Sequence, residues 1–474
     1  MKKKLYINGN WIEGSTYVDL FAPHSNEKIA EIPQATRENL ENAINSAKNA
    51  SIEMEKLSSY ERSVILEQLV DQFKENRNRL AEILALEASK PLKVAFGEID
   101  RTIATYKIAS EEAKRIYGET IPLDAVVGGE GRVTYTVREP IGVVGAITPF
   151  NFPFNLVAHK VGPAIAAGNT IVLKPASQTP LSAIALAEMI DKTDLPKGAF
   201  NLITGKGSEI GDALVSHPDV QAITFTGSPE VGISLKSKAG LKKVTLELGS
   251  NSALIIDEGV QLTKELINRC LWGSFVYNGQ VCISLQRIFV HDSLLNDFLA
   301  QMKEATENLK IGSPLDTETD ISALISSKDV MRIDQWVKNS INEGSELITG
   351  GNIIKDQIYA PTILANVSNS CEVSCKEIFG PVVTVNSFQN LDDAINEVNN
   401  SRYGLQAGIY TENLKNALYA TKKLHVGGVL VNDVPTFRVD LMPYGGVKES
   451  GYGREGIKYA IQEMTELKLI SIKM

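Results

Sequence analysis

The sequence predicts an α/β protein built on two mainly parallel sheets. From Pro140 onward, short apolar runs rich in β-branched residues alternate with segments whose apolar residues recur at helical spacing. Continuous apolar strands separated by helices indicate parallel sheets covered on both faces. The chain has 474 residues, enough for two or three domains. We therefore expect two such sheets in successive parts of the chain.

The elements are expected in the following order. Residues 1–35 are predicted to form short strands and turns, with Asn8-Gly9 as a hairpin signal. Thr36 caps a first helix, and residues 59–117 form long amphipathic helices. The first sheet is expected from the runs 142–147, 170–173, 200–203, 222–225 and 244–246. The second sheet is expected from the runs 253–256, 287–290, 382–385 and 427–431.

These runs divide the chain into three parts. Residues 1–119 and 140–246 form the first domain, residues 247–445 the second, and residues 120–139 and 446–474 a small β module. In that module, the alternating segment 132–138 can pair with the β-rich segment 467–472. The glycine-rich segment 451–456 follows no strand and is interpreted as a turn. Because GxGxxG is absent after the first parallel strand, the pattern alone indicates a nucleotide or sugar binder.

Composition excludes several classes of protein. A net charge of -9 argues against a broad nucleic-acid surface. No run approaches a membrane span, and a polar turn follows the amino-terminal lysines where a signal peptide would be apolar. Four cysteines in so long a chain fit a reducing, cytoplasmic location. Cys371 and Cys375 are four apart, but no further ligands accompany them, so no metal site is expected.

Three polar residues interrupt the apolar pattern. Cys282 follows an Asn-Gly-Gln turn, where it is either a nucleophile or, as free cysteines commonly are, a small buried hydrophobe. Glu247 ends a strand-like run, so it is either functional or at a solvent-facing strand end. Asn151 follows the first parallel strand, at the sheet edge where α/β proteins bind ligands.

Seven motifs occur in order: PFNFP, LKPASQTP, FTGS, LELGS, GQVCIS, EIFGP and PYGGVKESGYGREG. Together they resemble the aldehyde dehydrogenase superfamily from the first hairpin to the last strand. The resemblance implies the aldehyde dehydrogenase fold, with a Rossmann-like cofactor domain, an α/β catalytic domain and a small β oligomerisation module. It also implies a homodimer or homotetramer.

The resemblance assigns the catalytic roles. Cys282 attacks the aldehyde to form a thiohemiacetal, and hydride transfer to the cofactor leaves a thioester. The Asn151 amide and the Cys282 backbone N–H hold the oxyanion. Glu247 is the base that activates water, which favours a free carboxylic acid over an acyl-coenzyme A product. A cysteine-dependent esterase or thioesterase without redox chemistry is the alternative.

The cofactor is expected to be NADP or NAD. By resemblance, Lys174 contacts the adenosine ribose. Ser177 replaces the glutamate that often repels a 2′-phosphate, so NADP is accepted and a dual preference stays open. The other cofactor-binding residues implied are Thr148, Pro149, Phe225, Gly227, Ser228, Gly249, Glu377 and Phe379.

The substrate funnel is expected to be lined by Arg101, His159, Val281, Ile283 and Arg438. Two arginines and a histidine favour a small anionic aldehyde, because guanidinium groups bind such anions in pairs of hydrogen bonds. Alternatively, the two arginines do not bind substrate and are surface residues or form ion pairs between the domains. The overall sequence most resembles the lactaldehyde and non-phosphorylating glyceraldehyde-3-phosphate dehydrogenase branch of the family. Phosphonoacetaldehyde, sulfolactaldehyde and succinate semialdehyde are neighbouring substrates, and Val281 before the cysteine weighs against a phosphate.

Overall fold

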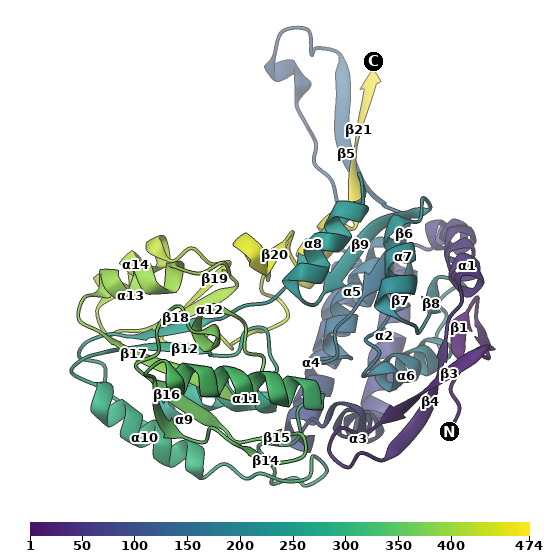
Figure 1. Ribbon diagram of the computed structural model, residues 1–474. Helices are drawn as coiled ribbons and strands as arrows, with labels where there is room; N and C mark the ends of the chain where they lie inside the picture. Colours follow the sequence, from purple (N-terminus) through teal and green to yellow (C-terminus); the bar gives the residue numbers. More distant parts are fainter.

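The first domain is built on an eight-stranded sheet. The computed structural model describes residues 1–474, and Figure 1 shows two α/β units side by side with a narrow extension projecting from one of them. The strand order is β2-β1-β8-β7-β6-β9-β10-β20, and the five central strands are parallel. The strands are β1 Leu5–Ile7, β2 Asn10–Ile12, β6 Val143–Ile147, β7 Thr170–Lys174, β8 Phe200–Leu202, β9 Val220–Thr226, β10 Lys243–Glu247 and β20 Gly451–Tyr452. A separate hairpin joins β3 Thr16–Phe21 to β4 Lys28–Gln34.

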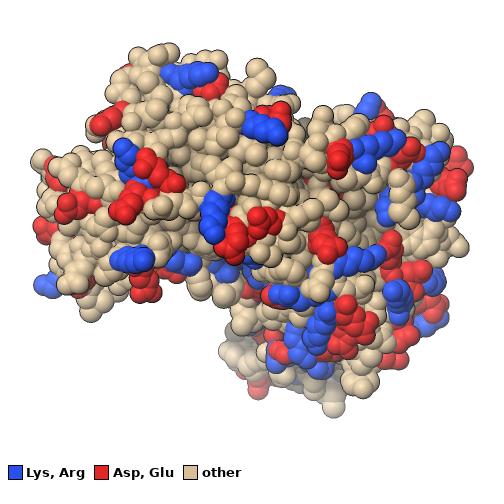
Figure 2. All heavy atoms as spheres, turned by 90° about the horizontal axis from the view of Figure 1, so that it is seen from below, with Lys and Arg blue, Asp and Glu red and all other residues tan.

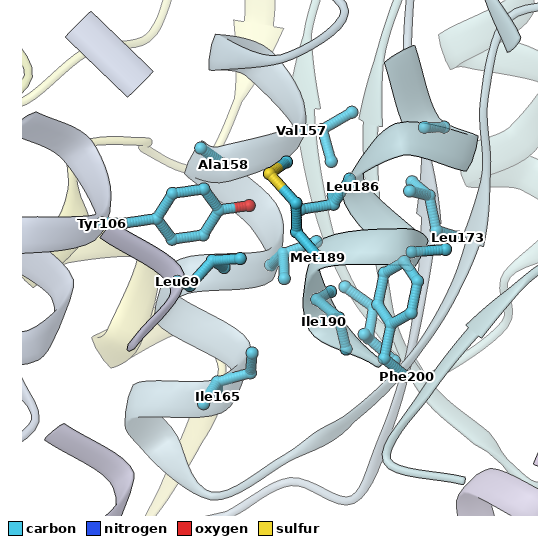
Figure 3. Close-up of a cluster of buried hydrophobic side chains, with 14 of the residues drawn as sticks. Leu69, Tyr106, Val157, Ala158, Ile165, Leu173, Leu186, Met189, Ile190 and Phe200 are labelled. Atoms are coloured by element: carbon cyan, nitrogen blue, oxygen red, sulfur yellow. The ribbon is translucent and has the colours of Figure 1, made fainter. Parts of the chain in front are cut away.

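Helices cover both faces of this sheet. They are α1 Arg37–Lys56, α2 Ser59–Glu75, α3 Arg77–Ala88, α4 Leu92–Glu112, α5 Asn155–Ala167, α6 Pro180–Ile190, α7 Asp212–Ser216, α8 Pro229–Lys238 and α15 Ile457–Glu463. Successive side chains of a strand point to opposite faces, so Val144 enters the core beneath α2, α4 and α5, and Val143 enters the core beneath α1. Figure 3 shows the first of these cores, where Leu173 and Phe200 meet Leu186 and Met189.

The second domain carries a seven-stranded sheet in the order β13-β16-β17-β12-β11-β18-β19, with only β13 antiparallel. The strands are β11 Ala253–Ile256, β12 Arg287–His291, β13 Glu346–Thr349, β16 Thr362–Ala365, β17 Val382–Phe388, β18 Gln406–Tyr410 and β19 Gly428–Val431. A small hairpin, β14 Ile353–Lys355 and β15 Ile358–Tyr359, lies apart from this sheet. The helices are α9 Lys264–Phe275, α10 Leu295–Glu307, α11 Ser327–Asn342, α12 Glu372–Cys375, α13 Leu391–Asn399 and α14 Leu414–Lys423.

The extension in Figure 1 is a two-stranded antiparallel ribbon. It pairs β5 Arg132–Pro140 with β21 Thr465–Lys473 over their whole length, as expected from the alternating segment 132–138 and the β-rich segment 467–472. Several of its apolar side chains are exposed, namely Val133, Leu467, Leu469 and Ile472. No helix of the chain combines the length and apolar composition needed to cross a bilayer. On the face shown in Figure 2, basic and acidic side chains are interspersed, with no extended basic patch.

One local interpretation was wrong. The glycine-rich segment 451–456 is not only a turn, because Gly451 and Tyr452 form β20 and pair with Glu247 and Leu246 at the edge of the first sheet. A strand of two residues has no periodic pattern, and its pairing depends on backbone groups that the side chains do not reveal. Residues 446–474 therefore contribute β20 and the core helix α15 to the first domain, in addition to β21.

Candidate active site

A cavity of about 690 Å³ lies between the two domains and reaches Cys282. Its walls come from α4 and α5 of the first domain, α9 of the second, and the loop after β19. Four of the five residues predicted to bind substrate line it: Arg101, Val281, Ile283 and Arg438. The remaining walls are largely apolar and include Leu271, Trp272 and Phe275. The cavity is therefore a mainly apolar funnel with two guanidinium groups near a thiol.

The loop that carries Cys282 is held in an unusual backbone conformation. Tyr277 and Asn278 both have left-handed φ values of 49° and 56°. Gly279 follows with φ 69°, and a Cβ there would lie 2.1 Å from the Gly380 carbonyl oxygen, so only glycine fits. The Asn278 side chain bonds the Ala323 carbonyl and the Ser322 N–H, which anchors the turn to the second domain. Such strain persists only where the surroundings fix it, and it is typical of functional loops.

The Cys282 thiol faces the Tyr444 hydroxyl, with Sγ and Oη 3.0 Å apart. Burial raises the pKa of this thiol to about 11, while the hydrogen bond from Tyr444 and the charge of Arg438 act in the opposite direction. The Cys282 backbone N–H has no hydrogen-bond partner in the chain. It is therefore available to a bound oxygen.

Asn151 lies just beyond the end of β6, where a buried lysine fixes it. Its amide Nδ2 donates to the Gln280 carbonyl oxygen over 3.0 Å, which leaves the second amide hydrogen free. The Lys90 ammonium donates to the Asn151 carbonyl oxygen over 2.5 Å and forms a fully buried ion pair with Glu98. Glu98 also accepts from the first backbone N–H groups of α5. Asn151 is therefore held against the cysteine loop.

Glu247 is the last residue of β10 and is 3% exposed. Neither of its carboxyl oxygens has a hydrogen-bond partner in the protein. Burial, and then the negative charge of Glu455, raise the pKa of Glu247 well above its ordinary value. Burial would also raise the pKa of Glu455, but the positive charges of Lys160 and Arg438 lower it overall. Two neighbouring carboxyl groups therefore have separated pKa values, with Glu247 as the readily protonated one.

Charged groups behind the funnel form one connected network. An Asp440 carboxyl oxygen lies 2.8 Å from both the His159 Nε2 and an Arg101 Nη. Arg438 lies 3.2 Å from the same His159 nitrogen and 3.5 Å from a Glu455 oxygen. The Nε atoms of Arg101 and Arg438 are buried and have no partner.

His159 was predicted to line the funnel, but it does not. It is 1% exposed and lies behind Asp440 and Arg438, so it can reach a substrate only through them. Burial, together with the charge of Arg438, lowers the pKa of His159, which keeps the imidazole neutral near pH 7. With its one proton on Nε2, the neutral imidazole donates to the Asp440 carboxylate without adding positive charge, and Arg438 lies beside it.

The residues predicted to bind the cofactor follow the carboxyl ends of the parallel strands. Lys174 is buried at the end of β7, where it reaches only the Pro175 carbonyl at 3.2 Å, and burial lowers its pKa to about 8. Ser177 is exposed. The Thr148 hydroxyl is buried without a partner, and Pro149 is partly exposed beside it. One sheet edge therefore presents an ammonium without a carboxylate partner and a hydroxyl without any partner.

The remaining cofactor candidates form two further groups. Gly227 packs against the Phe225 ring, and a Cβ at this position would lie 2.5 Å from it. Ser228 caps α8 by accepting a hydrogen bond from the Val231 N–H. A Cβ at Gly249 would lie 2.6 Å from a Glu377 oxygen. Burial raises the pKa of Glu377 to about 7, and the Ser250 N–H donates to it over 2.9 Å.

Phe379 and Glu377 line a second small cavity, which also touches Val281. Phe379 has φ 49°, and its ring meets Phe150 edge-on at 5.7 Å. Because Val281 lines both cavities, the cysteine loop separates the funnel from the side on which Glu377 and Phe379 lie.

Four site residues had no role in the sequence-based prediction: Tyr444, Lys90, Asp440 and Glu455. Tyr444 and Glu455 both belong to the motif PYGGVKESGYGREG. Their partners lie far away in the sequence, since Tyr444 is 162 residues from Cys282 and Glu455 is 295 residues from Lys160. No local pattern reveals such contacts.

Comparisons with known proteins bear on this arrangement. The model of the aldehyde dehydrogenase family matches residues 11–470. A 3-sulfolactaldehyde dehydrogenase of Priestia megaterium is 46% identical over 473 residues, covering 99% of this chain and 98% of that protein. A lactaldehyde dehydrogenase of Methanococcus aeolicus is 42% identical over 472 residues, covering 99% of each chain.

Solved structures agree with these matches. Aldehyde dehydrogenase 21 of Physcomitrella patens, in complex with the reaction product succinate, has a TM-score of 0.97 at 40% identity and covers 100% of this chain and 98% of that one. A glyceraldehyde-3-phosphate dehydrogenase of Methanocaldococcus jannaschii, in complex with NADP, has a TM-score of 0.93 at 40% identity and covers 97% of this chain and 100% of that one. The chain therefore belongs to the aldehyde dehydrogenase family, which confirms the NAD(P)-dependent aldehyde dehydrogenase predicted from its seven motifs.

Proposed function

We propose that this enzyme oxidises a small hydroxylated, anionic aldehyde to its carboxylic acid, with Cys282 as nucleophile. The observation that carries the proposal is the funnel, which places two guanidinium groups beside a thiol at its inner end. The apolar walls exclude water, and Arg101 and Arg438 supply the charge that an anion needs. No observation favours an esterase without redox chemistry.

The chain's own residues fit a nicotinamide dinucleotide. Lys174 offers an ammonium that bonds only the Pro175 carbonyl, Thr148 offers a hydroxyl without a protein partner, and the Gly249 backbone leaves no room for a side chain beside Glu377. Lys174 and Ser177 would hold the adenosine ribose, and Glu377 and Phe379 the nicotinamide end. Bound NAD(P) supplies the hydride acceptor. An exposed serine at 177 neither repels a 2′-phosphate nor requires one, so both cofactors are accepted.

In the first half of the reaction, the Cys282 thiolate attacks the aldehyde carbon and the carbonyl oxygen becomes an oxyanion. The free backbone N–H of Cys282 and the second amide hydrogen of Asn151 are the donors that we assign to this oxygen. The interaction of Lys90 with the Asn151 backbone keeps the amide oriented. Loss of hydride from the same carbon then leaves a thioester on Cys282.

In the second half, Glu247 removes a proton from water as the water attacks the thioester. Because neither of its oxygens is occupied by the protein, the carboxyl group is free to bind that water. A raised pKa makes its carboxylate a stronger base than an exposed glutamate would be. The C–S bond breaks, the acid leaves, and the thiol is restored.

The relatives narrow the substrate further. The 3-sulfolactaldehyde, lactaldehyde and glyceraldehyde-3-phosphate dehydrogenases are named for three-carbon aldehydes with a 2-hydroxyl group. We therefore propose a 2-hydroxyaldehyde of three carbons whose far end carries a sulfonate, because Val281 before the cysteine weighs against a phosphate. Arg101 is the better placed of the two arginines to meet that anion, because it lines the funnel and its side chain is 34% exposed, against 5% for Arg438.

The test is a panel of aldehydes assayed by nicotinamide reduction, with NAD and NADP in parallel. It contains 3-sulfolactaldehyde, lactaldehyde, glyceraldehyde 3-phosphate, phosphonoacetaldehyde, succinate semialdehyde and propanal. We expect the highest kcat/KM for an anionic 2-hydroxyaldehyde. Equal kcat/KM values across the panel would contradict anion recognition, and Cys282→Ser with undiminished activity would contradict the mechanism.

A cytoplasmic homodimer or homotetramer belongs to the same proposal. The ribbon of β5 and β21 exposes Leu467, Leu469 and Ile472, and apolar side chains on a projecting ribbon favour contact with a second copy. All four cysteines are free thiols, as expected in a reducing compartment. Light scattering on the wild type and on Leu469→Lys tests the assembly, since a charge at this position should shift the mass toward the monomer.

A further inference from the structure

Tyr444 is held rigidly beside the sulfur of Cys282. Its backbone N–H and C=O both bond to Glu455, over 3.0 and 2.7 Å, which fixes the position of the residue. The side chain is 3% exposed, and the Cys282 Sγ, at 3.0 Å, is the only hydrogen-bond partner of its hydroxyl. A buried phenol normally finds a good acceptor, and a neutral thiol is a weak one.

The ring and the hydroxyl of Tyr444 have separate contacts. The ring face lies against the Arg438 guanidinium, with 3.6 Å between Cζ and the ring centroid. Phenylalanine would make the same stacking contact, so packing alone does not call for a hydroxyl. The hydroxyl is therefore explained by the sulfur that it meets.

We propose that the Tyr444 hydroxyl donates a hydrogen bond to the Cys282 thiolate and so increases the fraction of the nucleophile that is ionised before the aldehyde binds. A hydrogen bond to an ionised acceptor is shorter and about twice as strong as one to a neutral acceptor, so this contact favours the thiolate over the thiol. When the thiol ionises, its proton leaves to water, and Tyr444 keeps its own. Tyr444 is then a catalytic residue, because it touches the reacting sulfur.

The electrostatics of the site make such a donor necessary. Burial works against the thiolate, and the nearby Glu377 and Glu247 carboxyl groups add to this effect. The Tyr444 hydrogen bond and the Arg438 charge oppose it. Burial also raises the pKa of Tyr444 well above its usual range, so the phenol stays protonated and remains a donor.

The test measures the alkylation of Cys282 by iodoacetamide as a function of pH, with no aldehyde present. Peptide mapping by mass spectrometry separates Cys282 from the other three cysteines. In Tyr444→Phe, we expect the apparent pKa of alkylation to rise by about one unit. At any pH well below this pKa, the reaction should then be about tenfold slower than in the wild type. This ratio should be the same at every pH well below the pKa of the thiol, and the acid limb of kcat/KM should move by the same amount.

Tyr359→Phe is the matched control. Tyr359 is also a fully buried tyrosine, but its hydroxyl has no partner and it lies in the core beneath α11. Its alkylation profile should overlay that of the wild type. Thermal unfolding of both variants checks that each is folded.

A second replacement should shift the apparent pKa of Cys282 in the opposite direction. A fluorotyrosine incorporated at position 444 keeps the ring and has a more acidic hydroxyl, so it should lower the apparent pKa of Cys282. Overlapping profiles for the wild type and Tyr444→Phe, or shifts of the same sign in both replacements, would overturn the inference.

The inference rests on the proposed nucleophilic role of Cys282, but the two can fail separately. Alkylation measures the thiol directly, so an unshifted profile leaves aldehyde oxidation standing. Full aldehyde oxidation by Cys282→Ser would instead remove the proposed function, whatever the alkylation profile shows.

Discussion

Replacing Glu247 with glutamine separates the two halves of the reaction. Glutamine has nearly the same shape, and neither carboxyl oxygen of Glu247 accepts a hydrogen bond in the protein, so the substitution breaks no contact. A carboxamide cannot take a proton from water, however. Attack by Cys282 and hydride transfer should therefore proceed, while hydrolysis of the thioester stops.

The expected loss follows from the role of a general base, which contributes about 10²–10⁴-fold. We expect Glu247→Gln to reduce kcat by that factor and to show a rapid burst of one reduced nicotinamide per active site. Rapid-mixing absorbance measures the burst, and intact-protein mass spectrometry detects the acyl group on Cys282. An unchanged kcat, or a loss of activity without any burst, would refute the assignment of Glu247 to deacylation.

The same variant has a consequence for stability. The pKa of Glu247 is raised in the folded protein, so the folded state holds its proton at pH values where the unfolded chain has released it. Stability from this group is therefore complete at acid pH and is lost as pH rises from the ordinary value of a glutamate through the raised one. Glutamine does not titrate, so the Tm of Glu247→Gln should exceed that of the wild type increasingly as pH rises. A constant or reversed difference would contradict the raised pKa.

Three further predictions concern single contacts. Arg101→Leu removes one charge-assisted hydrogen bond at a partly exposed site, so KM for an anionic aldehyde should rise about tenfold and KM for propanal should not; equal rises would exclude Arg101 as the anion contact. Ser177→Glu places a carboxylate where a 2′-phosphate would lie, so kcat/KM for NADP should fall about tenfold or more while that for NAD is retained, and parallel losses would argue against this position. Lys90→Met leaves Glu98 buried without its partner, at a cost of about 3–5 kcal/mol, and calorimetry should show a clearly lower Tm.

The parallel strands of the fold could be predicted because they are buried on both faces. Every residue of β6 and β7 is buried, so each strand is a continuous apolar run in the sequence. β18 gave no such signal, although it lies between β11 and β19. Its sequence Gln-Ala-Gly-Ile-Tyr includes Gly408, which is required because a Cβ there would lie 2.5 Å from the Asp433 carbonyl oxygen. A close approach of two backbones weakens the pattern that would identify the strand.

The residues of the active site also fall into those that the sequence predicts and those that it does not. Cys282, Glu247 and Asn151 each follow or end a predictable strand or turn, so sequence motifs locate them. The partners that tune them are contributed from elsewhere in the chain: Lys90 precedes α4, and Tyr444 follows β19. His159 shows the converse problem. Its place on α5 is correct, but Asp440 and Arg438 stand between it and the funnel.

The two arginines of the funnel differ in how many protein groups already contact their guanidinium groups. Arg438 is 5% exposed, stacks on the ring of Tyr444, and helps to keep Glu455 ionised. The charge of Glu455 in turn raises the pKa of Glu247, so removing Arg438 would disturb the nucleophile and the base together.

Arg101 contacts only Asp440 through its side chain, and its Nε has no partner. Asp440 also accepts a hydrogen bond from the neutral His159, so it keeps a second donor when a bound anion shares Arg101. An anion at Arg438 would instead compete with Glu455 for one guanidinium and weaken the positive charge that favours the Cys282 thiolate. The primary contact with the substrate anion is therefore expected at Arg101. A change in KM confined to anionic aldehydes can be interpreted cleanly for Arg101 variants, whereas Arg438 variants would mix binding with chemistry.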